Sequence, residues 1–140
     1  MTIELSPREP GTGLIRRLTL WLYRLSAIVL FALGIACWIR LIGVERGPLA
    51  RFDLMPVWWK LVMPPLAVVY PVAGMGLWMA AGWGAVLWVL IAIIEAVMHL
   101  GFPQLFGPDL VWLGFHAGGL IALAGLRIAA WRQTRPVRHP

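Results

Sequence analysis

The chain has 140 residues, of which 61% are hydrophobic and only 13% are charged. A soluble domain has about 45–50% apolar and about 25% charged residues, so this composition indicates an integral membrane protein and excludes an ordinary soluble domain. Lys and Arg outnumber Asp and Glu by 12 to 6. The arginines flank apolar runs instead of forming one basic face, which argues against a nucleic-acid partner.

Four apolar runs follow one another along the chain, and each is close to the roughly 20 residues needed to cross a hydrocarbon core of about 30 Å. They predict membrane-spanning helices at residues 18–42, 57–81, 83–100 and 110–131. The predicted fold class is therefore all-α, an integral membrane four-helix bundle with short loops. Residues 1–140 are expected to form this single domain, with short basic tails at both ends.

The first run, LTLWLYRLSAIVLFALGIAC, follows an arginine-rich start and has the outline of a secretory signal. A lipoprotein signal ending at Cys37 would prefer Leu where this chain has Gly34, so we predict an uncleaved first helix. Cys37 is the single cysteine. An internal disulfide and a thiolate metal cluster are therefore excluded.

The second and third runs are joined by AGWG alone, which predicts an antiparallel hairpin, because so short a connection leaves no chain for a crossover. The second run contains Pro64, Pro65 and Pro71. Proline removes a backbone donor and clashes with the preceding turn, so a kink is expected. The first two prolines fall in early turns, where helices tolerate them, which leaves Pro71 as the informative position. A broken helix lining a ligand site, as in transporters, is the alternative.

The fourth run is entered through FPQLFGPD, in which Gly107, Pro108 and Asp109 predict a helix stop, a break and a new helix start. An even number of spans puts both termini on one side of the membrane, and arginines flank both ends of the chain. The positive-inside rule then predicts a multi-pass protein of the bacterial inner membrane with both termini in the cytoplasm.

Small residues predict where the helices touch, because membrane helices associate by close packing and not by hydrophobic expulsion from water. The predicted packing positions are glycines of the second and fourth runs: Gly74, Gly76, Gly114 and Gly118. Gly114 and Gly118 form a GxxxG motif, which favours a tight helix contact.

Tryptophan is abundant, with nine residues in the chain. Most of them lie near predicted helix ends, as expected of anchors at the membrane surface. Trp88 alone lies well inside a span, and packing in the core, contact with lipid and stacking on a quinone all remain open for it.

Glu95 is the only acid inside a predicted span. An ionisable group in the bilayer costs at least about 2–3 kcal/mol unless it is paired or protonated, so Glu95 predicts a polar site. His99 follows four residues later, on the same helical face. Counting outward from the turn between the third and fourth helices puts Glu95 and His116 at similar depths of roughly 10 Å. The predicted partner of Glu95 in this polar cluster is His116, Arg40 or Lys60.

Two roles remain open for the cluster. It can fix the register of the helices, or it can relay protons or bind a ligand such as a lipid or quinone. Glu95, His99 and His116 are potential zinc or iron ligands, but no fourth ligand is evident and no metal site is predicted. The unequal depth of the two histidines argues against a haem, and no pigment is predicted. The chain has no nucleophile motif or nucleotide fingerprint, so no catalytic residue is predicted.

The run PPLAVVYPVAGMGLWMAAGWGAVLWVLIAIIEAVMH, followed by FHAGGL, resembles a small four-helix inner-membrane family of unknown function from alphaproteobacteria. The matching features are Pro71 to Ala73, Gly76 to Trp78, Trp83 with Gly84, Glu95, and His99 or His116. More loosely, the four-helix plan is similar to DoxX-like membrane proteins, some of which are subunits of quinone-linked oxidoreductases. The closer resemblance implies a fold and no activity.

The leading hypothesis is a non-catalytic accessory or assembly subunit of a bacterial inner-membrane complex, because the short loops leave no soluble domain. The alternative is a quinone-, lipid- or proton-handling module that uses the Glu95 cluster. A component of a small-molecule transporter is third, since four helices without a repeat need oligomerisation to enclose a path. The expected partners are the lipid bilayer and other membrane subunits or further copies of the chain.

Overall fold

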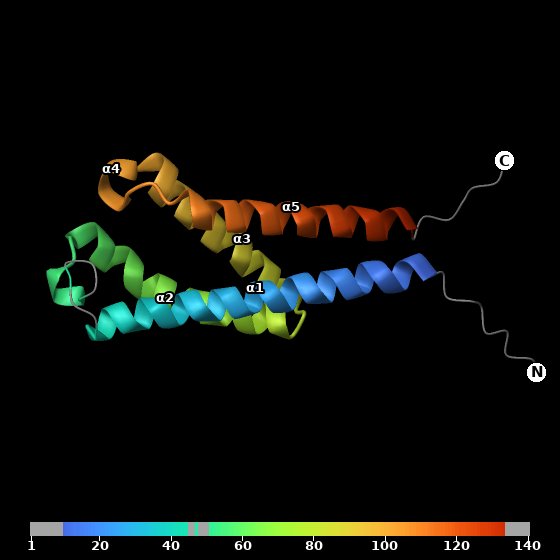
Figure 1. Ribbon diagram of the computed structural model, residues 1–140, viewed down its shortest axis with the longest axis horizontal. Helices are drawn as coiled ribbons and strands as arrows, with labels where there is room; N and C mark the ends of the chain where they lie inside the picture. The colour runs from blue at the N-terminus through green and yellow to red at the C-terminus, as the bar shows by residue number, and fades with distance from the viewer. Residues whose placement is uncertain (1–9, 45–46, 48–50, 134–140) are drawn as a thin grey trace, which may run out of the picture.

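The computed structural model describes residues 10–44, 47 and 51–133, and the regular structure within these ranges is entirely helical (Figure 1). The elements in chain order are α1 (Pro10–Ile42), the 3-10 helix η1 (Phe52–Leu54), α2 (Val57–Trp78), α3 (Gly82–Ala96), the π-helical turn η2 (Val97–Gly101), α4 (Pro103–Phe106) and α5 (Leu110–Gln133). Four segments are long and apolar enough to cross a membrane: Gly13–Ile42, Val57–Trp78, Gly82–Gly101 and Leu110–Gln133. The prediction of an all-α fold with four such helices is confirmed.

Two boundaries of the spanning helices differ from the prediction by three residues or more. α1 begins at Pro10 and not at residue 18, because Arg16 and Arg17 are good helix formers and proline is tolerated in a first turn. Part of the predicted basic tail is therefore helical, and the remaining tail residues lie outside the described ranges.

α2 ends at Trp78, three residues before the predicted end. Ala80 has a φ of +54°, and the N–H groups of Ala80 and Ala81 donate to the carbonyls of Leu77 (2.9 Å) and Gly76 (2.8 Å). These two bonds form a Schellman motif, which normally has glycine at the left-handed position. The helix end was missed because alanine occupies this position.

The three prolines do not interrupt α2, which is one helix from Val57 to Trp78. The broken helix considered above is therefore not formed. A Cβ atom on Gly34 of α1 would lie 2.7 Å from Cδ of Pro71, so the proline ring fills the space that the glycine leaves. Pro71 thus contributes to the packing of α1 against α2.

The four long helices form a ring in which α2 packs between α1 and α3, and α5 packs on α1 and α3. Gly74 lies against the backbone of Ala27, since a Cβ there would lie 3.1 Å from that carbonyl oxygen. A Cβ on Gly76 would lie 2.6 Å from Cα of Gly84. Both glycines therefore lie at close helix contacts.

Gly114 and Gly118 do not lie at such a contact, and this part of the prediction was wrong for contacts within the chain. Both are exposed, and a Cβ on either would meet nothing within 4 Å among the described residues. Gly119 makes the contact instead, because a Cβ there would lie 2.6 Å from the indole of Trp88. A GxxxG motif identifies a small-residue face of a helix but does not say which neighbour that face meets.

The helices differ in length, so the two ends of the bundle are built differently. α1 and α5 run antiparallel, so the start of α1 and the end of α5 lie at the same end (Figure 1). At that end, both helices extend beyond the turn that joins α2 to α3 (Figure 1). The opposite end carries η1, η2 and α4.

Candidate functional site

The centre of the candidate site is a contact between α3 and α5. Oε2 of Glu95 lies 3.0 Å from Nε2 of His116, and the two residues are only 5% and 1% exposed. This pair is the one expected from their equal depth. Both side chains therefore lie in the interior of the bundle and face one another.

Trp88 contacts the other side of the same imidazole. Its indole N–H donates to Nδ1 of His116 at 3.0 Å, and the side chain is fully buried. An indole N–H can only donate, so Nδ1 must be the unprotonated nitrogen, and the proton of the neutral ring lies on Nε2. Trp88 thus directs the Nε2–H group of His116 towards the Glu95 carboxylate.

The local structure of α3 explains this arrangement. Trp88 and Glu95 are seven residues apart, which is close to two helical turns, so they share one face of α3. His116 enters from α5 between them. Sequence reasoning missed the role of Trp88, although its position two turns before the only acid in a span was an available signal.

The Glu95–His116 contact has good distance but poor alignment. Within the described chain, neither Oε2 of Glu95 nor Nε2 of His116 has a hydrogen-bond partner with favourable angles. The two atoms are nevertheless 3.0 Å apart, which is within the usual N–H···O distance, so a hydrogen bond requires only that the N–H point at the oxygen. The present geometry leaves the carboxylate with unused acceptor capacity.

A cavity of about 180 Å³ adjoins Glu95, and His116 is not among its lining residues. It lies between α1, α2, η2 and the start of α5, and its polar lining residues are Cys37, Arg40, Tyr70, Glu95, His99 and Asp109. The exposure of the ionisable groups rises from buried Glu95 through half-buried His99 and Asp109 to exposed Arg40. The lining therefore forms a polar path from the interior towards the end of the bundle that carries α4.

His99 is placed by the π-helical turn η2, which continues α3. Nδ1 of His99 lies 2.7 Å from the carbonyl oxygen of Gly107, and a carbonyl only accepts, so Nδ1 carries the proton. In the neutral ring, Nε2 is then an acceptor. Single π-helical turns within α-helices are frequent at functional sites.

Asp109 begins α5 as the GPD sequence predicts. Its Oδ1 accepts a hydrogen bond from the backbone N–H of Trp112 at 3.3 Å, which is the geometry of a helix N-cap. Asp109 therefore has a structural role in addition to its place in the cavity wall.

The two predicted basic partners of Glu95 have different positions. Arg40 lines the cavity, but within the described residues it forms no ion pair with Glu95. Lys60 is not in the cluster, and this prediction was wrong. Its Nζ donates to the backbone carbonyl of Asp53 at 3.1 Å and lies 5.9 Å from the ring centroid of Phe52. The flexible lysine side chain extends to the loop before α2, where its charge remains solvated.

No group of three or more His, Cys, Asp or Glu side chains that could hold a metal is found in the described part of the chain. Glu95 and His99 both line the cavity, but the second histidine, His116, points its Nε2 at Glu95. The arrangement offers a donor on His116, a carboxylate acceptor on Glu95 and a polar cavity beside them, which is suited to binding water or exchanging a proton.

A family model described as a family of unknown function (DUF6163) matches residues 17–134. The chain belongs to this family. The DUF6163 match includes Glu95, His116 and Trp88, so the candidate site lies within the family region. The expectation of an uncharacterised family is confirmed. No curated protein and no solved structure matches the chain.

Proposed function

We propose that this chain is a proton-handling module of the bacterial inner membrane, in which Glu95 accepts a proton from one side and returns it to that side. The observation that carries the proposal is the position of the Glu95 carboxyl group, which lies 3.0 Å from Nε2 of His116 and also borders the polar cavity. A buried carboxyl group needs a partner and a route to water if it is to change its charge, and Glu95 has both.

The hydrogen bond from Trp88 to His116 supports Glu95 as the proton acceptor. A second proton on the imidazole would have to lie on Nδ1, where it would face the N–H group of Trp88. A proton that arrives through the cavity therefore binds to the carboxylate of Glu95. The Nε2–H group of His116 stabilises the carboxylate when the proton leaves.

The route ends at this pair. Beyond His116 lies Trp88, which is fully buried. The proposed function is therefore reversible protonation from one side and not conduction by a single chain.

The size of the cavity favours a proton over a quinone. Pockets for organic ligands usually measure about 300–1,000 Å³, and this cavity measures about 180 Å³. Each water takes about 30 Å³ in the liquid, so several waters fit where a substituted quinone ring and its tail do not. Such waters would connect Glu95 to His99 and Asp109.

Infrared difference spectroscopy on the protein in lipid nanodiscs tests the proposal. Between roughly pH 4 and pH 9, the wild type should gain and lose the C=O band of a carboxylic acid in an apolar environment. Glu95→Gln should lack this band, while Asp53→Asn, which removes an exposed acid, should keep it. A band that persists in Glu95→Gln, or one that does not respond to pH, would sink the proposal.

A second variant tests the route. Ala36 lines the cavity and is half-buried, so Ala36→Phe should block the path without touching the carboxyl group. The expected result is slower exchange of the Glu95 proton after transfer into D₂O, with the band itself retained. If the exchange rate is unchanged, the cavity is not the route.

A second candidate function, an accessory subunit of a membrane complex, is favoured by the exposure of α5. Within the most apolar 18-residue stretch of α5, only 11% of the residues are buried. The corresponding share is 28–44% in the other three spanning helices. The exposed Gly114 and Gly118 offer a partner helix a close approach. The looser resemblance to DoxX-like proteins, some of which are subunits of quinone-linked oxidoreductases, agrees with such a complex. Gly118→Leu should then abolish co-purification of a partner while the isolated chain stays folded.

The inner-membrane location and the cytoplasmic termini are part of the same proposal. They rest on the arginines at the start of α1 and the end of α5, which lie at one end of the bundle. Reporter fusions at Thr2 and Pro140 test the orientation. A reporter that is active only in the periplasm would reverse it.

A further inference from the structure

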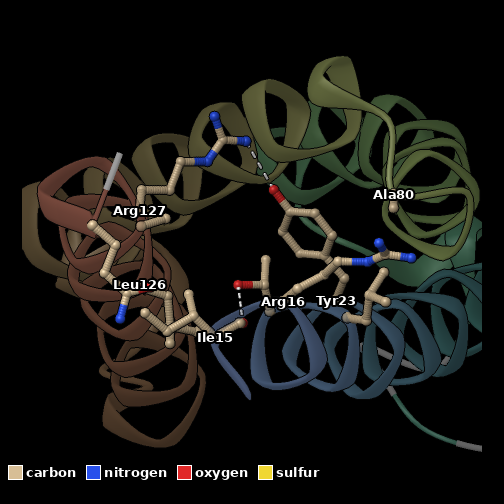
Figure 2. A pocket seen from close by; sticks show the side chains of 10 residues that line it. Ile15, Arg16, Tyr23, Ala80, Leu126 and Arg127 are labelled. Carbon is tan, nitrogen blue, oxygen red and sulfur yellow. Dashed lines mark hydrogen bonds between the residues drawn. The ribbon is translucent and has the colours of Figure 1, made fainter. Parts of the chain in front are cut away.

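A groove of about 430 Å³ lies between α1 and α5 (Figure 2). Its lining residues lie at the end of the bundle opposite to those of the Glu95 cavity. It lies where both helices extend beyond the turn joining α2 to α3, and Ala80 of that turn also lines it. Its volume falls within the usual range of about 300–1,000 Å³ for sites of organic ligands. The groove is therefore large enough for part of a lipid.

The lining combines apolar side chains with two cations. Leu20 and Leu126 are among its apolar residues, and Arg16 and Arg127 bring guanidinium groups from the two helices. No acid is among the described lining residues. The groove thus carries a net positive charge that nothing in its wall neutralises.

The polar groups of the groove are partly organised. An Nη2–H group of Arg127 donates to the hydroxyl of Tyr23 at 3.0 Å, which holds the guanidinium over the groove (Figure 2). Tyr23 is buried, whereas both arginines are exposed. A guanidinium has five N–H donors, so Arg127 keeps donors for an anion after it has bonded to Tyr23.

The groove lies at the level expected for lipid headgroups. The guanidinium of Arg24 lies 5.7 Å from the ring centroid of Trp78, at the end of α2, and such Trp and Arg residues mark a membrane surface. Arg16 lies about two turns, or roughly 12 Å, further out along α1. Arg16 therefore lies nearest the lipid phosphates, while Arg127, which bonds to Tyr23, lies nearer the level of Trp78 and of the apolar side chains.

We propose that this groove is a binding site for one anionic phospholipid, with its anionic headgroup between Arg16 and Arg127 and its first acyl carbons against Leu20 and Leu126. Basic pockets between membrane helices on the cytoplasmic side suit anionic headgroups. The proposal does not depend on proton handling at Glu95, because the two sites lie at opposite ends of the bundle.

Native mass spectrometry of the protein released from vesicles of equal phosphatidylglycerol and phosphatidylethanolamine tests the proposal. The wild type should retain one phosphatidylglycerol. Arg16→Gln with Arg127→Gln should retain about tenfold less or lower, since each arginine adds a direct contact to the general attraction. The matched control, Arg17→Gln with Arg132→Gln, removes the same charge from the same helices outside the groove and should retain the lipid.

Two further measurements guard against a folding defect and against a simpler ligand. Ala130 lines the groove and is exposed, so Ala130→Phe should fill the groove with all charges intact and should also lose the lipid at an unchanged melting midpoint. Addition of inorganic phosphate should not displace the lipid. The proposal is overturned if both double variants lose the lipid equally, if phosphatidylethanolamine is retained as well, if Ala130→Phe binds normally, or if phosphate competes.

Discussion

Gly84 of α3 faces Gly76 of α2 where the two helices meet, and Gly84→Ala is expected to force them apart. A Cβ at this position would lie 2.4 Å from the carbonyl carbon of Gly76 and 2.5 Å from the backbone nitrogen of Leu77. Ordinary contacts begin at 3.4 Å, so the helices must separate by about 1 Å. Because both opposing atoms belong to the backbone, no side-chain rotation can relieve the clash.

The magnitude follows from comparison with a matched substitution. Overpacking a well-packed contact costs about 1–3 kcal/mol, while replacing glycine by alanine inside a helix gains about 1 kcal/mol of helix propensity. Gly118→Ala has the same gain and no clash, because a Cβ at Gly118 meets nothing within 4 Å in the described structure. The propensity term cancels between the two variants, which leaves a difference of about 1–3 kcal/mol in the free energy of unfolding.

Thermal unfolding of both variants in mild detergent, followed by far-UV circular dichroism, measures this difference. Gly84→Ala should melt below the wild type, and Gly118→Ala should melt at or above it. Equal midpoints for the two variants would refute the close approach of α2 and α3 at Gly84.

Three further predictions concern other contacts. Gly119→Ala puts a Cβ 2.6 Å from Cη2 and Cζ2 of Trp88, so it should lower the melting midpoint. Adding Trp88→Phe to the same chain should recover part of this loss. If the effects of the two substitutions are strictly additive, the contact is contradicted. Ala80→Gly should raise the free energy of unfolding by about 1 kcal/mol, since Ala80 occupies the left-handed region; a lower midpoint would argue against the Schellman motif. A hydrogen bond from Arg51 lowers the pKa of the Asp53 carboxyl below its ordinary value of 3.8, so the stabilisation is complete above pH 3.8 and is lost as the pH falls through the lowered pKa. Arg51→Gln should return this pKa towards 3.8 in an NMR titration, and an unchanged value would show that the ion pair does not form in solution.

Much of the helix plan was accessible from the sequence, because apolar runs of membrane length have few alternatives to helices. The pairing of Glu95 with His116 was also accessible, since residues at equal distances from a short turn lie at equal depth on antiparallel helices. Depth depends only on counting residues. Counting along the chain therefore predicted the central pair correctly.

Rotation of each helix about its own axis was not accessible in the same way. Successive residues are about 100° apart around a helix, so the difference between Gly118 and Gly119 decides which one meets Trp88. That rotation is fixed by the fit of whole helix faces, which a single sequence motif does not encode. Lys60 was misplaced for a related reason, because its long side chain reaches a carbonyl in the adjacent loop and not the helix interior.

The position of His116 on α5 links two equilibria. α5 is the spanning helix with the smallest buried share. Its one fully buried large side chain, His116, accepts a hydrogen bond from Trp88 of α3 at Nδ1 and has its Nε2 3.0 Å from Oε2 of Glu95, also on α3. Coupling between two equilibria is reciprocal. If packing of α5 against α3 strengthens proton binding at Glu95, proton binding at Glu95 strengthens the packing of α5 by the same free energy. If Glu95 takes up a proton as proposed, a partner that pulls on α5 would change the protonation of Glu95, and a change in pH on the cavity side would change how firmly α5 is held.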